Sequence, residues 1–405
     1  MEQVLYQLPD GWEWCKLKSI TTKIGSGATP KGGEKAYKQI GISLIRSLNV
    51  HDCTFKKKRL AFIDDEQAGA LKNVIIESGD VLLNITGASI ARSCIVPDEY
   101  LPARVNQHVM IIRPTPKIDN KFLNYLIVNP KFKAQLLWQG AGGATRQALT
   151  KTMVEELDIP LPSIKEQKRI VEKLDELLTR IDTAIEHLQE SITLTDALYV
   201  SELSSVFSKG HEKWPLRELN EVAEVARGKS KHRPRNDKSL FGGEYPFIQT
   251  GNVRNAQKYI TTYSATYNEK GLQQSKLWPK DTICLTIAAN IGDVAILGMD
   301  ACFPDSVVGI SSSQLETDYL YYFLTTLQQQ LDSKANAAAQ KNINLKILSE
   351  IKIPVPVLDD QKEIIKRINE IDSLAVKLKA EVEDKIITMK QLKASILNSA
   401  FKGEL

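Results

Sequence analysis

Several short polar segments of this chain carry the side chains that proteins use to contact nucleic-acid bases. Arg and Lys form paired hydrogen bonds with guanine, and Asn and Gln do so with adenine. The run Ile42–Asn49 changes from apolar residues to Arg46, Ser47 and Asn49, which predicts a strand that delivers these side chains to one loop. Alternatively, they only keep that loop soluble.

Other polar groups follow predicted strands or precede predicted helices in both halves of the chain. Polar residues are common at such places, so a purely structural role remains the alternative for each of them. The candidates in the first half are Asn84, Thr86, Arg92, Thr145, Arg146 and Gln147. The candidates in the second half are Thr250, Asn252, Arg254, Asn290 and Lys341.

Two basic segments are suited to contacts with phosphate groups. Each phosphate that Lys or Arg neutralises adds salt-sensitive affinity without sequence preference. A solvated charged loop is the alternative for both segments. The first segment is Lys56–Arg59, with Lys57 as its candidate, and the second contains Arg227, Lys229, Lys231, Arg233 and Arg235.

Motifs of catalytic and nucleotide-binding sites do not occur in the sequence. The glycine-rich run Gly25–Pro30 departs from the phosphate-binding patterns G-x-x-x-x-G-K-[ST] and G-x-G-x-x-G. No H-E-x-x-H, G-x-S-x-G or Asn/Asp-Pro-Pro-Tyr-like loop is found. The five cysteines are scattered without C-x-x-C spacing, so we expect small apolar core residues and no metal site. We therefore expect no catalytic residues.

Composition places the chain among ordinary globular proteins. Its 405 residues suggest about two or three domains, and 42% are hydrophobic. A net charge of only +4 means that contacts with nucleic acid have to come from local basic patches. The first residues lack a signal-peptide pattern and no apolar run approaches ~20 residues, which predicts a cytoplasmic protein.

The chain is organised as a tandem repeat. Ile159–Pro162 followed by Gln167 recurs as Ile353–Pro356 followed by Gln361, with the same interval between the two copies of each motif. This indicates a duplicated unit of roughly 200 residues. Further matches in the same order are Trp14 with Trp214, Ile45 with Ile248, Asn49 with Asn252, and Gly79–Val96 with Lys280–Leu297.

The first part of each repeat has an α+β pattern. Phe122–Val128 and Phe132–Trp138 are predicted helices, with Asn129 as the N-cap of the second and Pro130 at its first position. Runs rich in β-branched residues predict strands at Asp80–Ile85, Val109–Arg113 and Asp281–Ile287.

The second part of each repeat is a long helix that begins just after Pro162 or Pro356. A helix of about 40 residues would reach ~60 Å. Steps of three and four between apolar residues indicate a coiled-coil seam. The seam of the first helix is Ile170, Leu174, Leu177, Ile181, Ala184, Leu188 and Ile192. That of the second is Ile364, Ile368, Ile371, Ala375, Leu378, Val382, Ile386, Met389, Leu392 and Ile396.

The two helices offer two modes of pairing. A heptad stripe could dimerise the protein, but two equivalent helices in one chain can also pair with each other. Antiparallel pairing would relate the two halves by an approximate two-fold axis. This suits duplex DNA, which has local two-fold symmetry between its strands, and proteins that match it present two recognition surfaces ~34 Å, or a multiple of that, apart. Because the two domains differ in sequence, we expect them to read different half-sites.

The duplicated order of variable domain, I-P-[LV]-P, Q-K and heptad helix resembles the specificity subunits of type I restriction–modification systems. The resemblance covers the full length, and its strongest motifs are Ile159–Pro162 with Gln167-Lys168 and Ile353–Pro356 with Gln361-Lys362. It implies target recognition domains at residues 1–158 and 210–352. It implies helical spacers at residues 159–209 and 353–405.

The resemblance also implies a function and partners. Two DNA-methyltransferase subunits would dock on the helical regions, and restriction subunits would complete a nuclease. S-adenosylmethionine, ATP and Mg would bind those partners, and this chain would bind double-stranded DNA without a cofactor of its own. The alternative is a coiled-coil protein-interaction scaffold without DNA specificity.

Overall fold

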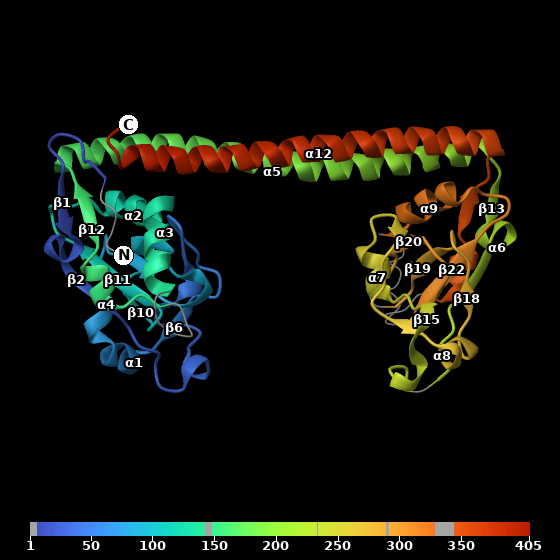
Figure 1. Ribbon diagram of the computed structural model, residues 1–405, viewed down its shortest axis with the longest axis horizontal. Helices are drawn as coiled ribbons and strands as arrows, with labels where there is room; N and C mark the ends of the chain where they lie inside the picture. Colours follow the sequence, from blue (N-terminus) through green and yellow to red (C-terminus); the bar gives the residue numbers. More distant parts are fainter. Residues whose placement is uncertain (1–5, 142–147, 233, 289–290, 329–343) are drawn as a thin grey trace. The chain divides into compact units, whose positions relative to one another are not determined.

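The chain folds as two compact units. The computed structural model describes residues 6–141, 148–232, 234–288, 291–328 and 344–405. Unit 1 comprises Met1–Gln189 with Glu383–Leu405, and unit 2 comprises Glu190–Val382. Each unit joins an α+β domain to part of both long helices, α5 (Ile164–Lys213) and α12 (Leu358–Ala400), which confirms the predicted fold class (Figure 1). Within the described ranges, no helix combines the length and the apolar character that crossing a membrane requires.

The domain of unit 1 contains two four-stranded sheets, with strand orders β2-β11-β8-β9 and β6-β3-β10-β7. The strands of unit 1 are β1 (Glu13–Lys16), β2 (Thr21–Ser26), β3 (Ile42–Ile45), β4 (Val50–His51), β5 (Thr54–Phe55), β6 (Ala61–Ile63), β7 (Ile75–Ile76), β8 (Val81–Asn84), β9 (Ser93–Ile95), β10 (Ala103–Val105), β11 (Val109–Pro114) and β12 (Asp158–Leu161). Its shorter helices are α1 (Asp65–Ala70), α2 (Asn120–Val128), α3 (Pro130–Ala141) and α4 (Lys151–Glu155).

Strand β8 shows why these apolar runs become central strands. Successive side chains of a strand point to opposite faces of its sheet. Leu83 therefore packs in the core formed with α2, α3 and the long helices, whereas Leu82 packs in the core between the two sheets. Both side chains are fully buried, so the strand is apolar on both faces. In Figure 1, α2 lies directly beneath the long helices of this unit.

The domain of unit 2 is built around one five-stranded sheet, with strand order β14-β22-β19-β20-β16. The strands of unit 2 are β13 (Leu216–Glu218), β14 (Glu224–Arg227), β15 (Phe241–Pro246), β16 (Tyr259–Ile260), β17 (Thr266–Tyr267), β18 (Leu277–Trp278), β19 (Ile283–Thr286), β20 (Val294–Leu297), β21 (Ala301–Cys302), β22 (Val307–Ser311) and β23 (Lys352–Pro354). Its shorter helices are α6 (Leu219–Val222), α7 (Thr250–Asn255), α8 (Glu269–Gln273), α9 (Thr317–Thr326) and α11 (Leu345–Ser349).

The predicted helix boundary at Asn129 is confirmed. The side-chain oxygen of Asn129 accepts hydrogen bonds from the backbone N–H groups of Lys131 and Phe132, at 3.0 and 3.1 Å. It therefore caps α3, whose first residue is Pro130. The equivalent of α2 in unit 2 is α9, which lies between the sheet and the long helices (Figure 1).

The repeated I-P-[LV]-P motif closes each domain. Strand β12 contains Ile159 and pairs antiparallel with β1, so that Pro160 lies opposite Trp14. In unit 2, β23 pairs in the same way with β13, and Pro354 lies opposite Leu216. The beginning and the end of each domain are thereby held together where the chain enters a long helix.

The long helices pair antiparallel within each unit. In unit 1, Lys393 donates to Asp182 at 2.6 Å, and Arg169 donates to the carbonyl oxygen of Leu405. Residue numbers thus fall along α12 as they rise along α5. In unit 2, Lys379 donates to Asp196 at 2.8 Å. The predicted antiparallel pairing is confirmed. Helix α5, with 50 residues, is longer than the expected length of about 40, and α12, with 43, is close to it.

Part of the predicted seam is wrong. Leu378 and Leu392 are about half exposed, whereas Leu178 and Leu397, which the heptad pattern omits, are buried. An α-helix has 3.6 residues per turn, so a strict repeat of 3.5 drifts off the contact line unless the helices supercoil.

Candidate nucleic-acid interface

Loops from several strands of unit 1 meet at one edge of its sheets. The backbone N–H of Gly27, just after β2, donates to the carbonyl oxygen of Asn106 at 3.1 Å. Asn106 donates in turn to Ile45 at the end of β3, and Ile85 after β8 donates to His108 at 3.0 Å. We call this loop edge 1, and it consists of Gly27–Pro30, Arg46–Asn49, Ile85–Ser89 and Asn106–His108.

Two of the predicted DNA-contacting amides shape this edge from inside. Asn49 is fully buried, accepts from the N–H of Arg46 at 3.1 Å and donates to the carbonyl of Lys56 at 2.8 Å. Asn84, also fully buried, donates to the carbonyl of Ser47 at 2.9 Å. In this conformation neither amide offers an edge to a base, so the prediction of a direct contact is corrected to a supporting role.

Asn49 and Asn84 hold the other candidates at the same edge. Arg46 forms an ion pair with Glu34 at 2.9 Å, donates to the carbonyl of Arg59 at 2.6 Å and lies over the ring of Tyr37. The Glu34 side chain is 83% exposed, and an ion pair with so exposed a partner contributes only about 0–1 kcal/mol. The Arg46 side chain is itself only 12% exposed, and its predicted contact with DNA stays a prediction. Ser47 and Arg92 are half-buried and Lys57 is exposed, so their predicted DNA contacts stay predictions.

Sequence reasoning missed Gln107 and His108, which lie at the centre of loop edge 1. His108 contacts Thr86 through Nδ1 at 2.6 Å and Gln107 through Nε2 at 2.9 Å. Thr29 donates to the side-chain oxygen of Gln107. The available signal was an amide and an imidazole directly before the predicted strand Val109–Arg113.

Unit 2 repeats this arrangement with different side chains. Ile287 donates to Ser306 at 3.0 Å, as Ile85 does to His108 in unit 1, and Gly228 donates to Val307, the residue after Ser306, at 2.9 Å. The side-chain oxygen of Asn252 accepts from the N–H of Gln249 at 2.9 Å, as that of Asn49 does from Arg46. We call this loop edge 2, and it consists of Arg227–Lys231, Gln249–Asn252, Ile287 and Pro304–Ser306.

The glycine at the start of each loop edge is required by close packing. A Cβ atom on Gly27 would lie 1.7 Å from the carbonyl oxygen of Val105, and one on Gly228 would lie 2.3 Å from that of Phe303. Both distances are far below van der Waals contact. Gly27 of the run Gly25–Pro30 therefore allows the backbone there to pack closely against the backbone at Val105.

The basic loop of loop edge 2 is partly tied down. Arg235 pairs with Asp305 at 2.7 Å. His232 lies 2.8 Å from Asp237, and hydrogen bonds from Ser239 and His232 hold the pKa of Asp237 at about 2. The exposed members of the predicted set in this region are Arg227, Lys229, Lys231 and Arg235. Within the described residues, the first three have no carboxylate partner like that of Arg235, and their predicted contacts with phosphate stay predictions.

Helix α7 carries the remaining second-half candidates in the described residues, and two of them, Thr250 and Asn252, belong to loop edge 2. Thr250 and Asn252 are half-buried and Arg254 is exposed. Burial raises the pKa of Asp293, and the nearby Arg254 opposes this rise. Six predicted residues lie outside the described residues: Thr145, Arg146, Gln147, Arg233, Asn290 and Lys341.

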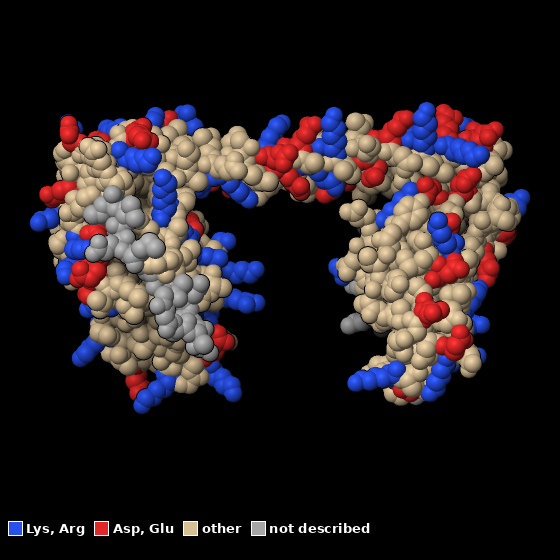
Figure 2. Space-filling model, viewed as in Figure 1, with Lys and Arg blue, Asp and Glu red and all other residues tan. Residues whose placement is uncertain are grey.

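The long helices carry charges of both signs (Figure 2), and the cysteines in the described part of the chain are not grouped into a metal site. On the face shown in Figure 2, Lys and Arg alternate with Asp and Glu along the long helices. Among the residues that the structure describes, no group of His, Cys, Asp and Glu could hold a metal ion. Cys94, Cys284 and Cys302 are buried as predicted, but Cys53 is exposed because it occupies a tight turn with φ of 55° between β4 and β5.

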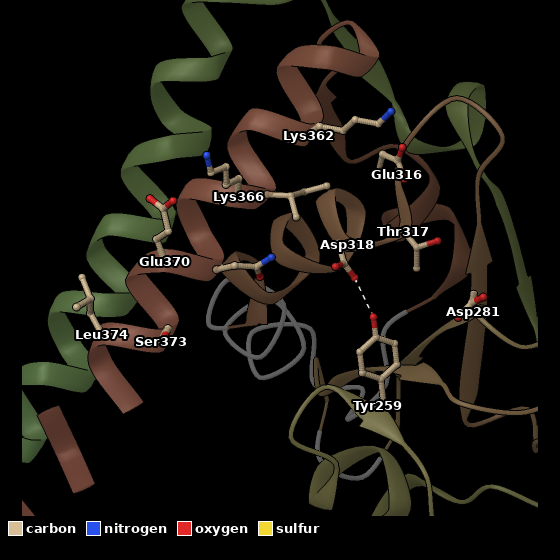
Figure 3. A pocket seen from close by; sticks show the side chains of 12 residues that line it. Tyr259, Asp281, Glu316, Thr317, Asp318, Lys362, Lys366, Glu370, Ser373 and Leu374 are labelled. Carbon is tan, nitrogen blue, oxygen red and sulfur yellow. Dashed lines mark hydrogen bonds between the residues drawn. The ribbon is translucent and has the colours of Figure 1, made fainter. Parts of the chain in front are cut away.

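A large open pocket lies at the other end of β19 from loop edge 2. It has a volume of about 1070 Å³ and is bounded by α12, the start of α9 and Tyr259 of β16. Figure 3 shows Lys362 and Lys366 on its helical wall, and Tyr259 donating to Asp318 at 3.2 Å. The lining carries charges of both signs and joins the domain to α12.

Comparison with known proteins decides the family. The family model for the type I restriction modification DNA specificity domain matches residues 9–194 and again residues 211–387. This chain belongs to that family. The two consecutive matches confirm the predicted tandem repeat. They give no support to the alternative of a coiled-coil scaffold without DNA specificity.

Relatives match over nearly the whole length. The specificity subunit of the type I restriction enzyme EcoKI from Escherichia coli K12 is 21% identical over 430 residues, which cover 98% of this chain and 90% of that protein. The HsdS subunit from Thermoanaerobacter tengcongensis is 22% identical, with a TM-score of 0.59 and full coverage of both chains. A chain from a study of assembly and conformational transition in the type I R-M system is 22% identical, with a TM-score of 0.78 over 99% of this chain and 100% of that one. These solved structures share the fold of the two specificity domains.

Proposed function

We propose that this chain is the sequence-specificity subunit of a type I restriction–modification complex and recognises a bipartite, asymmetric DNA target. The observation that carries the proposal is a closed turn, Arg46–Asn49 in unit 1 and Gln249–Asn252 in unit 2, held by the same Asn-to-backbone hydrogen bond. The turn is common to both units, but its first side chain is Arg in one and Gln in the other. Arg suits guanine and Gln suits adenine, so the two units read different half-sites.

The long helices are the docking region for partner subunits in this proposal. In unit 2, Leu194 and Leu198 on α5 and Leu374 and Val376 on α12 are all more than half exposed. These exposed apolar side chains are available to a protein partner. Two methyltransferase subunits dock there and restriction subunits join them in the cytoplasm. The chain itself is non-catalytic, and S-adenosylmethionine, ATP and Mg bind the partners.

Methylome sequencing tests this function. Cells that carry this chain with its methyltransferase subunit are expected to methylate adenine within one split sequence, and cells with the methyltransferase alone are the control. The proposal is abandoned if methylation follows no bipartite motif, or if the motif persists without this chain.

A further inference from the structure

Gln107 is an exposed amide at the centre of loop edge 1. It lies in the turn between β10 and β11, next to the buried Asn106. An exposed glutamine side chain ordinarily samples many rotamers, and fixing them costs binding free energy. Gln107 differs because both polar atoms of its amide already have a protein partner.

The hydrogen-bond chain around Gln107 has one consistent direction. The hydroxyl of Thr29 donates to Gln107 Oε1, because an amide oxygen only accepts. Gln107 Nε2 only donates, so the contact at 2.9 Å makes His108 Nε2 the acceptor. The neutral imidazole then carries its proton on Nδ1 and donates it to the hydroxyl of Thr86 at 2.6 Å. Thr29 and His108, the latter held by Thr86, thus fix the orientation of the Gln107 amide.

These hydrogen bonds leave the Gln107 amide with one free acceptor and one free donor. Its oxygen has two lone pairs and its nitrogen two hydrogens, and one of each is used. In the major groove, adenine presents the N6 amino group as a donor beside N7 as an acceptor. In number and kind, the free lone pair and the free N–H of Gln107 complement that pair.

We propose that Gln107 reads an adenine in the half-site bound by unit 1, through paired hydrogen bonds to N6 and N7, and that Thr29 and His108 are positioning residues for it. The inference rests on the proposed function and names a base contact within it. Unit 2 does not share the contact. Asp305 lies in its equivalent turn, directly before Ser306, and is paired with Arg235.

Binding to modified DNA tests the contact. The complex of this chain with its methyltransferase subunits is titrated with target duplexes in which single adenines are replaced by 7-deazaadenine, which lacks N7. With wild-type protein, replacement at one adenine of the unit 1 half-site weakens binding about 10-fold or more. Gln107→Ala weakens binding to the unmodified target by a similar factor and abolishes the effect of that replacement.

Gln39→Ala is the matched control, since Gln39 is exposed in the same unit but precedes the opposite end of β3. This variant keeps wild-type affinity and sensitivity. If Gln107→Ala melts below the wild type, Gln107→Met, which keeps the side-chain volume, takes its place under the same criterion. Undiminished sensitivity to 7-deazaadenine in the folded Gln107 variant overturns the inference, whereas wild-type protein that prefers no sequence overturns the proposed function instead.

Discussion

Gln167 accepts a hydrogen bond from the backbone N–H of Asp119 at 2.7 Å, which fastens the start of α5 to the loop before α2. Its amide nitrogen also donates to the carbonyls of Lys117 and Pro162. The side chain is fully buried. Gln361 makes the same three contacts in unit 2, with Glu316, Gln314 and Pro356. The repeated glutamine therefore sets how each domain is attached to its helix.

Replacing this glutamine should destabilise the unit that contains it. Gln167→Leu keeps the volume but leaves a buried N–H and two carbonyls without partners, which costs about 1–3 kcal/mol per unsatisfied group. We expect a lower melting temperature by calorimetry, with the loss in the transition of unit 1. Gln361→Leu should act on unit 2. Lys168→Ala, an exposed neighbour on α5, is the control, and equal melting of Gln167→Leu and this control would refute the attachment role.

Asn49 should matter more for stability than its counterpart Asn252. Asn49 is fully buried and bridges Arg46, Lys56 and Lys58, whereas Asn252 is half-buried. Asn49→Ala is expected to lower the free energy of unfolding in urea by about 1–3 kcal/mol, and Asn252→Ala by less. An Asn49→Ala protein with unchanged stability would show that the turn holds without its cap.

Gly27→Ala should be far more damaging than Gly25→Ala. The new Cβ would overlap the carbonyl oxygen of Val105 in the first case, and nothing lies within 4 Å of it in the second. Overpacking of this kind costs about 1–3 kcal/mol or more. Thermal unfolding of the two variants measures the difference, and similar stabilities would contradict the close crossing of the two backbones.

The basic loop of unit 2 should act through phosphate. The logarithm of the binding constant falls with the logarithm of salt concentration, with a slope of about −0.9 per phosphate contact on duplex DNA. Lys229→Ala and Lys231→Ala should each reduce that slope by about one contact on specific and nonspecific DNA alike. Arg235→Ala, whose charge is paired with Asp305, should change it less. If both lysine variants keep the wild-type salt dependence of binding, these lysines are solvent-exposed residues that do not contact DNA.

The repeat made the architecture predictable. The spacing of Ile159–Pro162 and Gln167 relative to their second copies revealed the tandem repeat and located both long helices, because these motifs make the same contacts in each unit. The seam was predicted less well. Leu378 fits a heptad pattern but is exposed. The heptad repeat of 3.5 residues drifts relative to the 3.6 residues per turn of an α-helix, and residue types alone do not reveal which period the helix follows.

The candidate site was predicted at the level of loops rather than side chains. The sequence located Arg46–Asn49 and Asn84 because polar residues end apolar strands there. It did not show that Asn49 and Asn84 face inward, since an amide is equally suited to a base edge and to a backbone carbonyl. Gln107 was missed because its significance depends on Thr29 and His108, and Thr29 meets it only in the folded sheets.

Exchange of one reading domain tests the central claim most directly. Residues 20–150 are replaced by the corresponding segment of another specificity subunit, and methylated adenines are mapped across the genome. If each unit reads one half-site, one half of the motif changes, while the other half and the spacer between them stay as in the wild type. A change in both halves, or in neither, would contradict the account.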